Sequence, residues 1–329
     1  MTAPSAPPSA ALDSVLPYAV PSLDLRGRVV RLGPALDAIL ARHAYPTPVA
    51  RLLAEAIALT SLLGTALKFE GRFVLQTRTD GPVSMLIVDF QTPDGLRAYA
   101  SFDAEAVEAA IAQGSATPAD LLGRGHLAMT IDQGGDMNRY QGVVALDHTG
   151  LEEVAHVWFQ QSEQIPTKVR LAVAEELTRL PGGGTRHAWR AGGLLAQFLP
   201  ESEDRRRARD LHPGDAPEGT DLPEVADDDA WTEAEALVAT IEDLELTDPE
   251  VSAERLLFRL FHERGARVFE PQTLVERCRC SRERVEDMLG QFTAEQVEDM
   301  TVDGAIVVTC EFCSTKYTFD PATVRPPAA

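Results

Sequence analysis

The sequence predicts an α+β domain, followed by a charged and partly helical linker and a small C-terminal module. Three observations support this architecture. Short strand-forming runs alternate with helical patterns and turn residues through the first 200 positions. Residues 201–230 then contain few large apolar side chains, and all four cysteines of the 329-residue chain fall between positions 278 and 313.

Residues 1–22 are rich in Pro, Ala and Ser and are predicted to form a disordered tail. No Lys or Arg precedes Arg26, so the N-terminus lacks the charged region of a secretory signal. No run approaches the ~18 apolar residues of a membrane-spanning helix. We therefore expect a cytoplasmic protein without a membrane partner, in which clustered cysteines are more often metal-binding or redox-active than structural disulfides.

The predicted domain covers residues 23–200. A strand is expected at 24–32, a short helix from Pro34, and a long helix from Thr47, a suitable N-cap before Pro48. That helix is apolar over most of its surface, which indicates a central, buried position. Its apolar residues at helical spacing are Leu52, Leu53, Ala56, Leu59, Leu62, Leu63 and Leu67.

Further strands and one amphipathic helix complete this domain. Glycine-containing turns separate the strand-like runs, as expected for antiparallel hairpins. The expected strands are 72–79, 83–90, 96–102, 126–132, 139–147, 168–174 and 194–200, and the helix is 150–164. The glycines of "PGGGTRHAWR" lack the spacing and the Lys-Ser/Thr pair of a phosphate-binding loop, and no nucleophile elbow or paired-histidine motif is present. No catalytic residues are predicted, and an enzyme is not expected.

Residues 201–265 are predicted to form an acidic, partly helical and metastable linker. Positions 201–250 carry 18 Asp or Glu against 4 Arg, which is −14 of the net charge of −21. Such a charge repels phosphate backbones and argues against nucleic-acid binding. The basic cluster "RRRAR" at 205–209 is interpreted as a solvated face among acidic neighbours.

Two helices with narrow apolar stripes are expected in the second half of this linker. The first begins near Thr232 and carries Leu237, Ile241 and Leu244. The second spans 252–263, with Ser252 as its cap and a stripe of Leu256, Leu257, Leu260 and Phe261. Helices that are acidic outside and narrowly apolar inside are expected to dock weakly.

The C-terminal module, residues 266–329, contains Cys278, Cys280, Cys310 and Cys313. They form a C-x-C pair and a C-x2-C pair separated by 29 residues. Four thiolates from two close pairs suit one tetrahedral Zn²⁺, with the second pair on a hairpin. Nearby cations, Arg277, Arg279, Arg282, Arg284 and Lys316, are expected to offset the negative charge and to lower the thiol pKa values after metal loss.

A module of about 60 residues has a marginal core, and zinc in comparable modules contributes roughly 10–16 kcal/mol. Metal and fold are therefore expected to be coupled. A zinc ion would link the two distant cysteine pairs to each other. If each pair instead oxidised within itself, two disulfides that close very short loops would replace this link, and disulfides in short loops contribute little stability. The layout indicates a module that unfolds on oxidation.

The motifs "CRCSRERV" and "CEFC" resemble those of the heat-shock protein 33 family of redox-regulated holdase chaperones. "RYQGVVALD", "SEQIPT" and "EVSAERLLFRLFHE" are similar to other parts of that family, and the resemblance covers roughly residues 23–320. It implies one zinc ion bound by the four cysteines in the reduced state. It also implies that oxidation links Cys278 to Cys280 and Cys310 to Cys313, releases zinc and unfolds the linker.

By the same resemblance, the partners are unfolded or partly folded client proteins, the mechanism needs no ATP, and the oxidised form is expected to be a homodimer. An alternative from another class is a thiol–disulfide oxidoreductase that uses Cys310 and Cys313. Against it, this pair is expected on a hairpin, remote from the βαβ unit of thioredoxin-like proteins. A third possibility, a nucleic-acid-binding zinc ribbon, is opposed by the negative charge.

Overall fold

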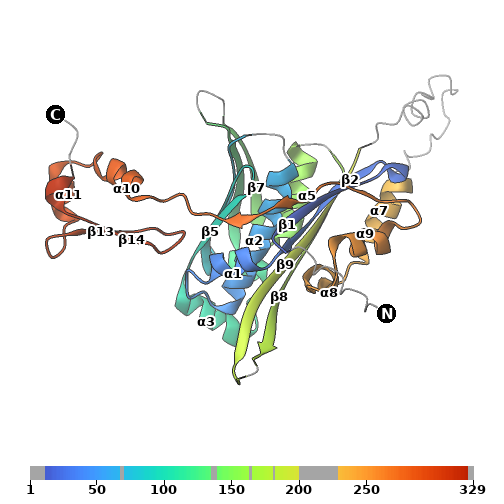
Figure 1. Ribbon diagram of the computed structural model, residues 1–329, viewed down its shortest axis with the longest axis horizontal. Helices are drawn as coiled ribbons and strands as arrows, with labels where there is room; N and C mark the ends of the chain where they lie inside the picture. The colour runs from blue at the N-terminus through green and yellow to red at the C-terminus, as the bar shows by residue number, and fades with distance from the viewer. Residues whose placement is uncertain are drawn as a thin grey trace, which may run out of the picture.

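The computed structural model describes residues 12–66, 70–134, 139–162, 165–180, 182–199 and 229–324 (Figure 1). Within these ranges, two six-stranded sheets dominate the fold. The first sheet has the order β10-β1-β2-β9-β8, with β11 also paired to β1, and the second has the order β12-β5-β4-β3-β6-β7. This arrangement confirms the predicted α+β class.

Most of the predicted strands are present, with bounds that differ by a few residues. They are β2 (Leu25–Leu32), β3 (Arg72–Thr79), β4 (Val83–Gln91), β5 (Gly95–Phe102), β6 (Arg124–Asp132), β7 (Tyr140–Asp147), β8 (Thr167–Arg179) and β9 (Thr185–Phe198), and they are preceded by β1 (Ser14–Val20), which was not predicted. Strands β8 and β9 are much longer than expected because they pair with each other along the whole of β8. The residues near the hairpin end are mostly polar, so the sequence pattern does not predict them as strand. They belong to the strands because their main-chain groups pair.

Helix α2 (Thr47–Ala66) is the centre of the main hydrophobic core and contacts strands of both sheets. It begins at the residue expected to cap it. By length and composition α2 could cross a membrane, but 78% of its apolar window is buried inside the protein. It is therefore the central helix that its composition predicts, packed between two sheets.

Shorter helices surround this core: α1 (Pro34–Leu40), α3 (Ala104–Gln113), α4 (Pro118–Leu122) and α5 (Leu151–Ser162). Helix α3 is absent from the sequence prediction, although its ends carry clear signals. Asp103 accepts hydrogen bonds from the amides of Glu105 and Ala106, and Gly114 ends the helix with a positive φ of 70°. Its weak apolar pattern, rich in Ala, conceals it.

A second core lies on the outer face of the first sheet. There Leu16, Tyr18 and Val20 of β1 pack beneath three helices of the linker region. These helices are α7 (Asp229–Ala239), α8 (Asp243–Thr247) and α9 (Ala253–Phe261). The prediction for the last is confirmed: Ser252 caps α9, and Leu256, Leu257, Leu260 and Phe261 are buried.

The first linker helix differs from its prediction. Helix α7 begins at Asp229 and buries Ala230, Ala234 and Val238, whereas Leu244 is 69% exposed. Of the expected stripe, Ile241 is buried and Leu237 packs against the second core, but the prediction for Leu244 is wrong because the helix ends at Ala239 and Leu244 belongs to the separate short helix α8. Small alanines in α7 allow its backbone to approach the sheet closely.

From α9 the chain crosses the body of the protein to the C-terminal module, as Figure 1 shows in orange. We call residues 267–276 the bridging segment. It contains β10 (Arg267–Val268), β11 (Gln272–Thr273) and β12 (Val275–Glu276). The module beyond it contains α10 (Arg282–Leu289), α11 (Ala294–Asp299) and a hairpin of β13 (Ile306–Thr309) and β14 (Lys316–Phe319).

The predicted tail of residues 1–22 is wrong from Ser14 onward, where the chain forms β1. The reason is tertiary: β1 pairs with β2 on one side and with the bridging segment on the other. Parts of several predictions lie outside the described residues. These parts are positions 1–11 of the tail, Leu67 of the long helix, positions 163–164 of the helix at 150–164, position 200 of the last strand of the domain, residues 201–228 with the basic cluster at 205–209, and residues 325–329 of the C-terminal module.

Candidate metal centre

Two separate parts of the chain supply the four cysteines. Cys278 and Cys280 follow β12 in a stretch without regular secondary structure, just before α10, whose N-terminus is capped by the Ser281 hydroxyl. Cys310 and Cys313 lie in the turn between β13 and β14. The Cys310 amide donates to the Thr315 carbonyl at 2.9 Å, which closes this turn as the sequence predicts.

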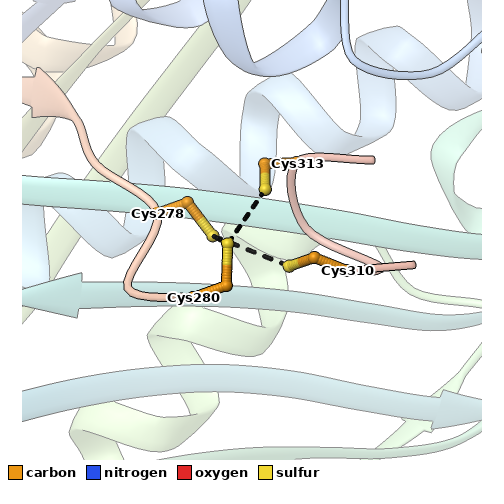
Figure 2. A group of neighbouring side chains, drawn as sticks. All are labelled: Cys278, Cys280, Cys310 and Cys313. Atoms are coloured by element: carbon orange, nitrogen blue, oxygen red, sulfur yellow. Dashed lines mark hydrogen bonds between the residues drawn. The ribbon is translucent and has the colours of Figure 1, made fainter. Parts of the chain in front are cut away.

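All four sulfur atoms lie within 4.8 Å of one another, and the side chains converge on one point (Figure 2). The Sγ–Sγ distances are 3.4 Å for Cys278–Cys280, 3.7 Å for Cys278–Cys310 and 3.3 Å for Cys280–Cys313. Sulfur atoms at ~2.3 Å from a tetrahedral zinc would be separated by roughly 3.8 Å. The donor set and its spacing therefore fit a single metal ion of this type.

The sulfur atoms also take part in hydrogen bonds within the module. Tyr317 donates its hydroxyl to Cys280 Sγ at 3.2 Å, and Cys313 Sγ lies 3.2 Å from the Thr315 hydroxyl. Both partners belong to the hairpin, one on β14 and one just before it. Such contacts orient sulfur ligands and favour their charged form.

The thiols differ in how easily they ionise. Burial raises the pKa of Cys280 to about 12 and also raises the pKa of Cys310. Burial opposes ionisation of Cys313 as well, but hydrogen bonds with Thr315, Cys280 and Cys278 together outweigh it and lower the pKa of Cys313 to about 6. In the metal-free arrangement, Cys313 is thus the thiol most easily ionised among these three.

The arginines beside the cysteines have a different role from the predicted one. Arg277 pairs with Asp94 at 2.8 Å, and the guanidinium of Arg282 lies over the Phe319 ring. Arg284 donates to the Arg279 carbonyl at 2.8 Å. Burial is the largest cause of the raised pKa values of Cys280 and Cys310, so the expected lowering by these cations does not prevail at these two thiols.

Arg279 instead joins the module to the second sheet. Its Nη2 donates to Oδ2 of Asp89 at 3.1 Å, and its Nη1 donates to Gln91 at 3.3 Å. Asp89 is buried in β4 and is also held by Arg97 at 2.6 Å and by Arg72 at 3.9 Å. Sequence reasoning missed this cluster, for which the signal is a lone Asp within the otherwise apolar run of β4.

Two further contacts dock the cysteine hairpin on the same domain. The Arg97 guanidinium lies 4.0 Å from the centre of the Phe312 ring, between Cys310 and Cys313 in sequence. The Ser314 hydroxyl donates to the Arg42 carbonyl at 2.9 Å. Each half of the cysteine cluster therefore has its own attachment to the N-terminal domain.

Comparisons with known proteins agree with this architecture. A model of the Hsp33 protein family matches residues 13–320. The chain is 45% identical to a 33 kDa chaperonin of Caulobacter vibrioides over 320 residues, covering 96% of this chain and 98% of the relative. It is 36% identical to a 33 kDa chaperonin of Pseudomonas fluorescens, covering 92% and 88% of the two chains.

A solved structure shows the same fold. The crystal structure of a 33 kDa chaperonin, a heat shock protein 33 homologue from Thermotoga maritima, matches with a TM-score of 0.69 at 19% identity. The match covers 95% of this chain and 96% of that one.

Proposed function

The chain belongs to the Hsp33 protein family, whose named relatives are chaperones, and from this premise we propose that it is a redox-regulated, ATP-independent holdase. In this proposal it binds unfolding client proteins under oxidative stress. The observation that carries the redox part is the convergence of four sulfur atoms from two chain segments on one point.

In the reduced state, Cys278, Cys280, Cys310 and Cys313 would hold one zinc ion, which supplies a long-range tie within the module. The module needs that tie because its own core is small. Its buried apolar residues are Leu289, Val297, Ile306, Phe319 and Val324. Metal binding in modules of this size is inseparable from folding.

On oxidation, Cys278 would pair with Cys280 and Cys310 with Cys313. Each disulfide forms as one hydrogen peroxide takes two electrons from two thiols and becomes two water molecules. The sulfurs can then no longer serve as four thiolate ligands, and the two halves of the module lose their connection. The short loops closed by these disulfides return little stability.

Unfolding of the module would affect the linker helices through the bridging segment, because this segment lies between α9 and Cys278 in the chain. Helices α7 to α9 cover apolar side chains of β1, β2 and β9. If they detach, that face becomes available to clients. We assign the metastable linker to 201–265 and the switch module to 266–329, and we extend the chaperone domain, expected at 23–200, to begin at Ser14 because β1 pairs with β2.

We further propose that the protein acts in the cytoplasm, needs no catalytic residue, and forms a homodimer when oxidised. The high negative charge would keep chaperone–client complexes soluble. The alternative, a thiol–disulfide oxidoreductase using Cys310 and Cys313, is less well supported. Cys313 is buried within the module, and the pair lies on a hairpin turn.

The decisive experiment is light scattering from a thermally unfolding client without ATP. One sample contains the reduced, zinc-loaded chain, and the other contains peroxide-treated chain whose released zinc is measured. We expect suppression of aggregation only in the second sample. Equal scattering from both would contradict the redox switch, and catalytic turnover of a disulfide substrate would favour the oxidoreductase.

A further inference from the structure

The bridging segment closes an edge of both sheets. Strands β10 and β11 pair antiparallel with β1, the edge of the first sheet, and β12 pairs parallel with β5, the edge of the second. In Figure 1 the segment crosses the middle of the molecule between the linker helices and the C-terminal module. One stretch of ten residues therefore covers two rows of main-chain donors and acceptors.

Main-chain hydrogen bonds provide much of this contact. The amide of Phe269 donates to the Pro17 carbonyl at 3.0 Å, and the amide of Leu274 donates to the Asp13 carbonyl at 2.7 Å. Each paired strand of the segment is two residues long, and the side chains of Val268 and Phe269 are 47% and 56% exposed. Only Leu274 enters the main core. The segment is thus held loosely between α9 and the cysteine cluster.

The free edge of β1 would offer a defined pattern of groups. Because main-chain groups alternate in a strand, Val15 and Ala19 face the same side as Pro17. Pro17 has no N–H, so this side presents an unbroken series of acceptors but loses one donor in its middle. Proline on an edge strand limits pairing between identical edges, which protects against aggregation.

We propose that, once the bridging segment has detached, the edge of β1 binds an extended segment of an unfolded client by strand addition, in the place of residues 267–273. This inference rests on the proposed holdase function. The present occupant supports it, because the edge already pairs with an extended peptide through main-chain groups with little side-chain burial. Such pairing accepts many sequences, as clients require.

The neighbouring apolar face makes this edge a composite surface. Side chains of Leu16, Tyr18 and Val20 point to the face that the linker helices cover. Release of the linker would uncover that face beside the edge. Alternate side chains of an added client strand would then lie over apolar surface, while its main chain pairs with β1.

The first test uses hydrogen–deuterium exchange of the full-length chain. The probe is reduced, carboxymethylated α-lactalbumin, a permanently unfolded polypeptide. We expect oxidation to speed exchange in the peptide covering 12–20, and the probe to slow it again by roughly tenfold. Unchanged exchange upon probe binding would overturn the inference. Slowing that depends on chain concentration without probe would also overturn it, since a second copy would then occupy the edge.

The second test removes one outward donor. Ala19→Pro deletes the N–H of Ala19, and Ala19→Val is the matched control that keeps it. For the oxidised chain we expect Ala19→Pro to weaken probe binding about fivefold, the loss of one hydrogen bond, with zinc release unchanged. Equal binding by both variants would refute strand addition alone. If oxidised wild type neither binds the probe nor suppresses aggregation, the holdase proposal itself fails.

Discussion

Arg279 donates a hydrogen bond from Nη2 to Oδ2 of Asp89 across a distance of 3.1 Å, although 190 positions separate the two residues. Arg279 lies between Cys278 and Cys280, and Asp89 is 3% exposed in β4. Any change in the conformation of the C-x-C pair therefore acts on a buried charge in the second sheet. This contact connects the candidate metal centre to the domain that would bind clients.

Substitution of Arg279 should loosen docking without removing the metal ligands. In Arg279→Ala, Asp89 keeps Arg97 and Arg72, so the domain remains folded. Loss of the charged hydrogen bond should weaken docking by about 1–3 kcal/mol. We expect faster hydrogen exchange in residues 267–277, unchanged zinc content, and client protection at lower peroxide doses.

Arg124→Ala is the control for this variant. It removes an ion pair with Asp147 in which the two side chains are 70% and 76% exposed. Such pairs are worth less than about 1 kcal/mol, so exchange in the bridging segment should match wild type. Equal exchange in both variants would show that the Arg279 contact does not hold the module.

The linker helix α9 offers a matched pair of phenylalanines. Phe261 is fully buried and stacks on Tyr18 with ring centres 5.9 Å apart, whereas Phe258 is 70% exposed. Phe261→Ala should destabilise linker docking by roughly 3–5 kcal/mol, which would give partial client protection even in the reduced chain. Phe258→Ala should behave as wild type in the same light-scattering assay. If Phe261→Ala remained inactive when reduced, linker release would not be sufficient for activity.

Replacement of one cysteine should abolish zinc binding without affecting the fold of the N-terminal domain. In Cys313→Ser we expect zinc content to fall well below one ion per chain and proteolysis of residues 278–324 to accelerate. The N-terminal domain should keep its thermal transition, because its core is separate. Thr318→Ser, on the exposed side of β14, should retain zinc. Full zinc content in Cys313→Ser would mean that Cys313 is not a ligand.

Features encoded by local spacing could be predicted from the sequence. The C-x-C and C-x2-C pairs identify the candidate site, and Ser252 with a stripe ending at Phe261 identifies α9. Strand β1 could not be found this way, because residues 14–20 gain their order from β2 and from a segment more than 240 positions away. The contact between Arg279 and Asp89 is equally non-local, and only the fold brings the two residues together.

Glu55, on the central helix α2, should make stability depend on pH. Burial is the main cause that raises its pKa to about 7, and the Glu152 carboxylate adds to the effect. Arg51 and Arg170 act in the opposite direction, and Asp243 of the linker raises the pKa further. The charged and titratable side chains around this site are therefore contributed by α2, α5, β8 and α8.

The sign of this dependence follows from the two pKa values of Glu55. Its ordinary value is 4.5, so between pH 4.5 and about 7 the folded chain binds more protons than the unfolded chain. The stabilisation is complete below pH 4.5 and is lost as the pH rises through 7, at a cost of up to about 3 kcal/mol. We therefore expect the free energy of unfolding of Glu55→Gln, relative to that of wild type, to be higher at pH 8 than at pH 5. Urea unfolding at the two pH values measures this difference. Glu153→Gln, on the exposed side of α5, is the control and should show the same difference in stability between pH 5 and pH 8 as wild type. If the stability of Glu55→Gln changed with pH in parallel with that of wild type, Glu55 would not be the cause of the pH dependence.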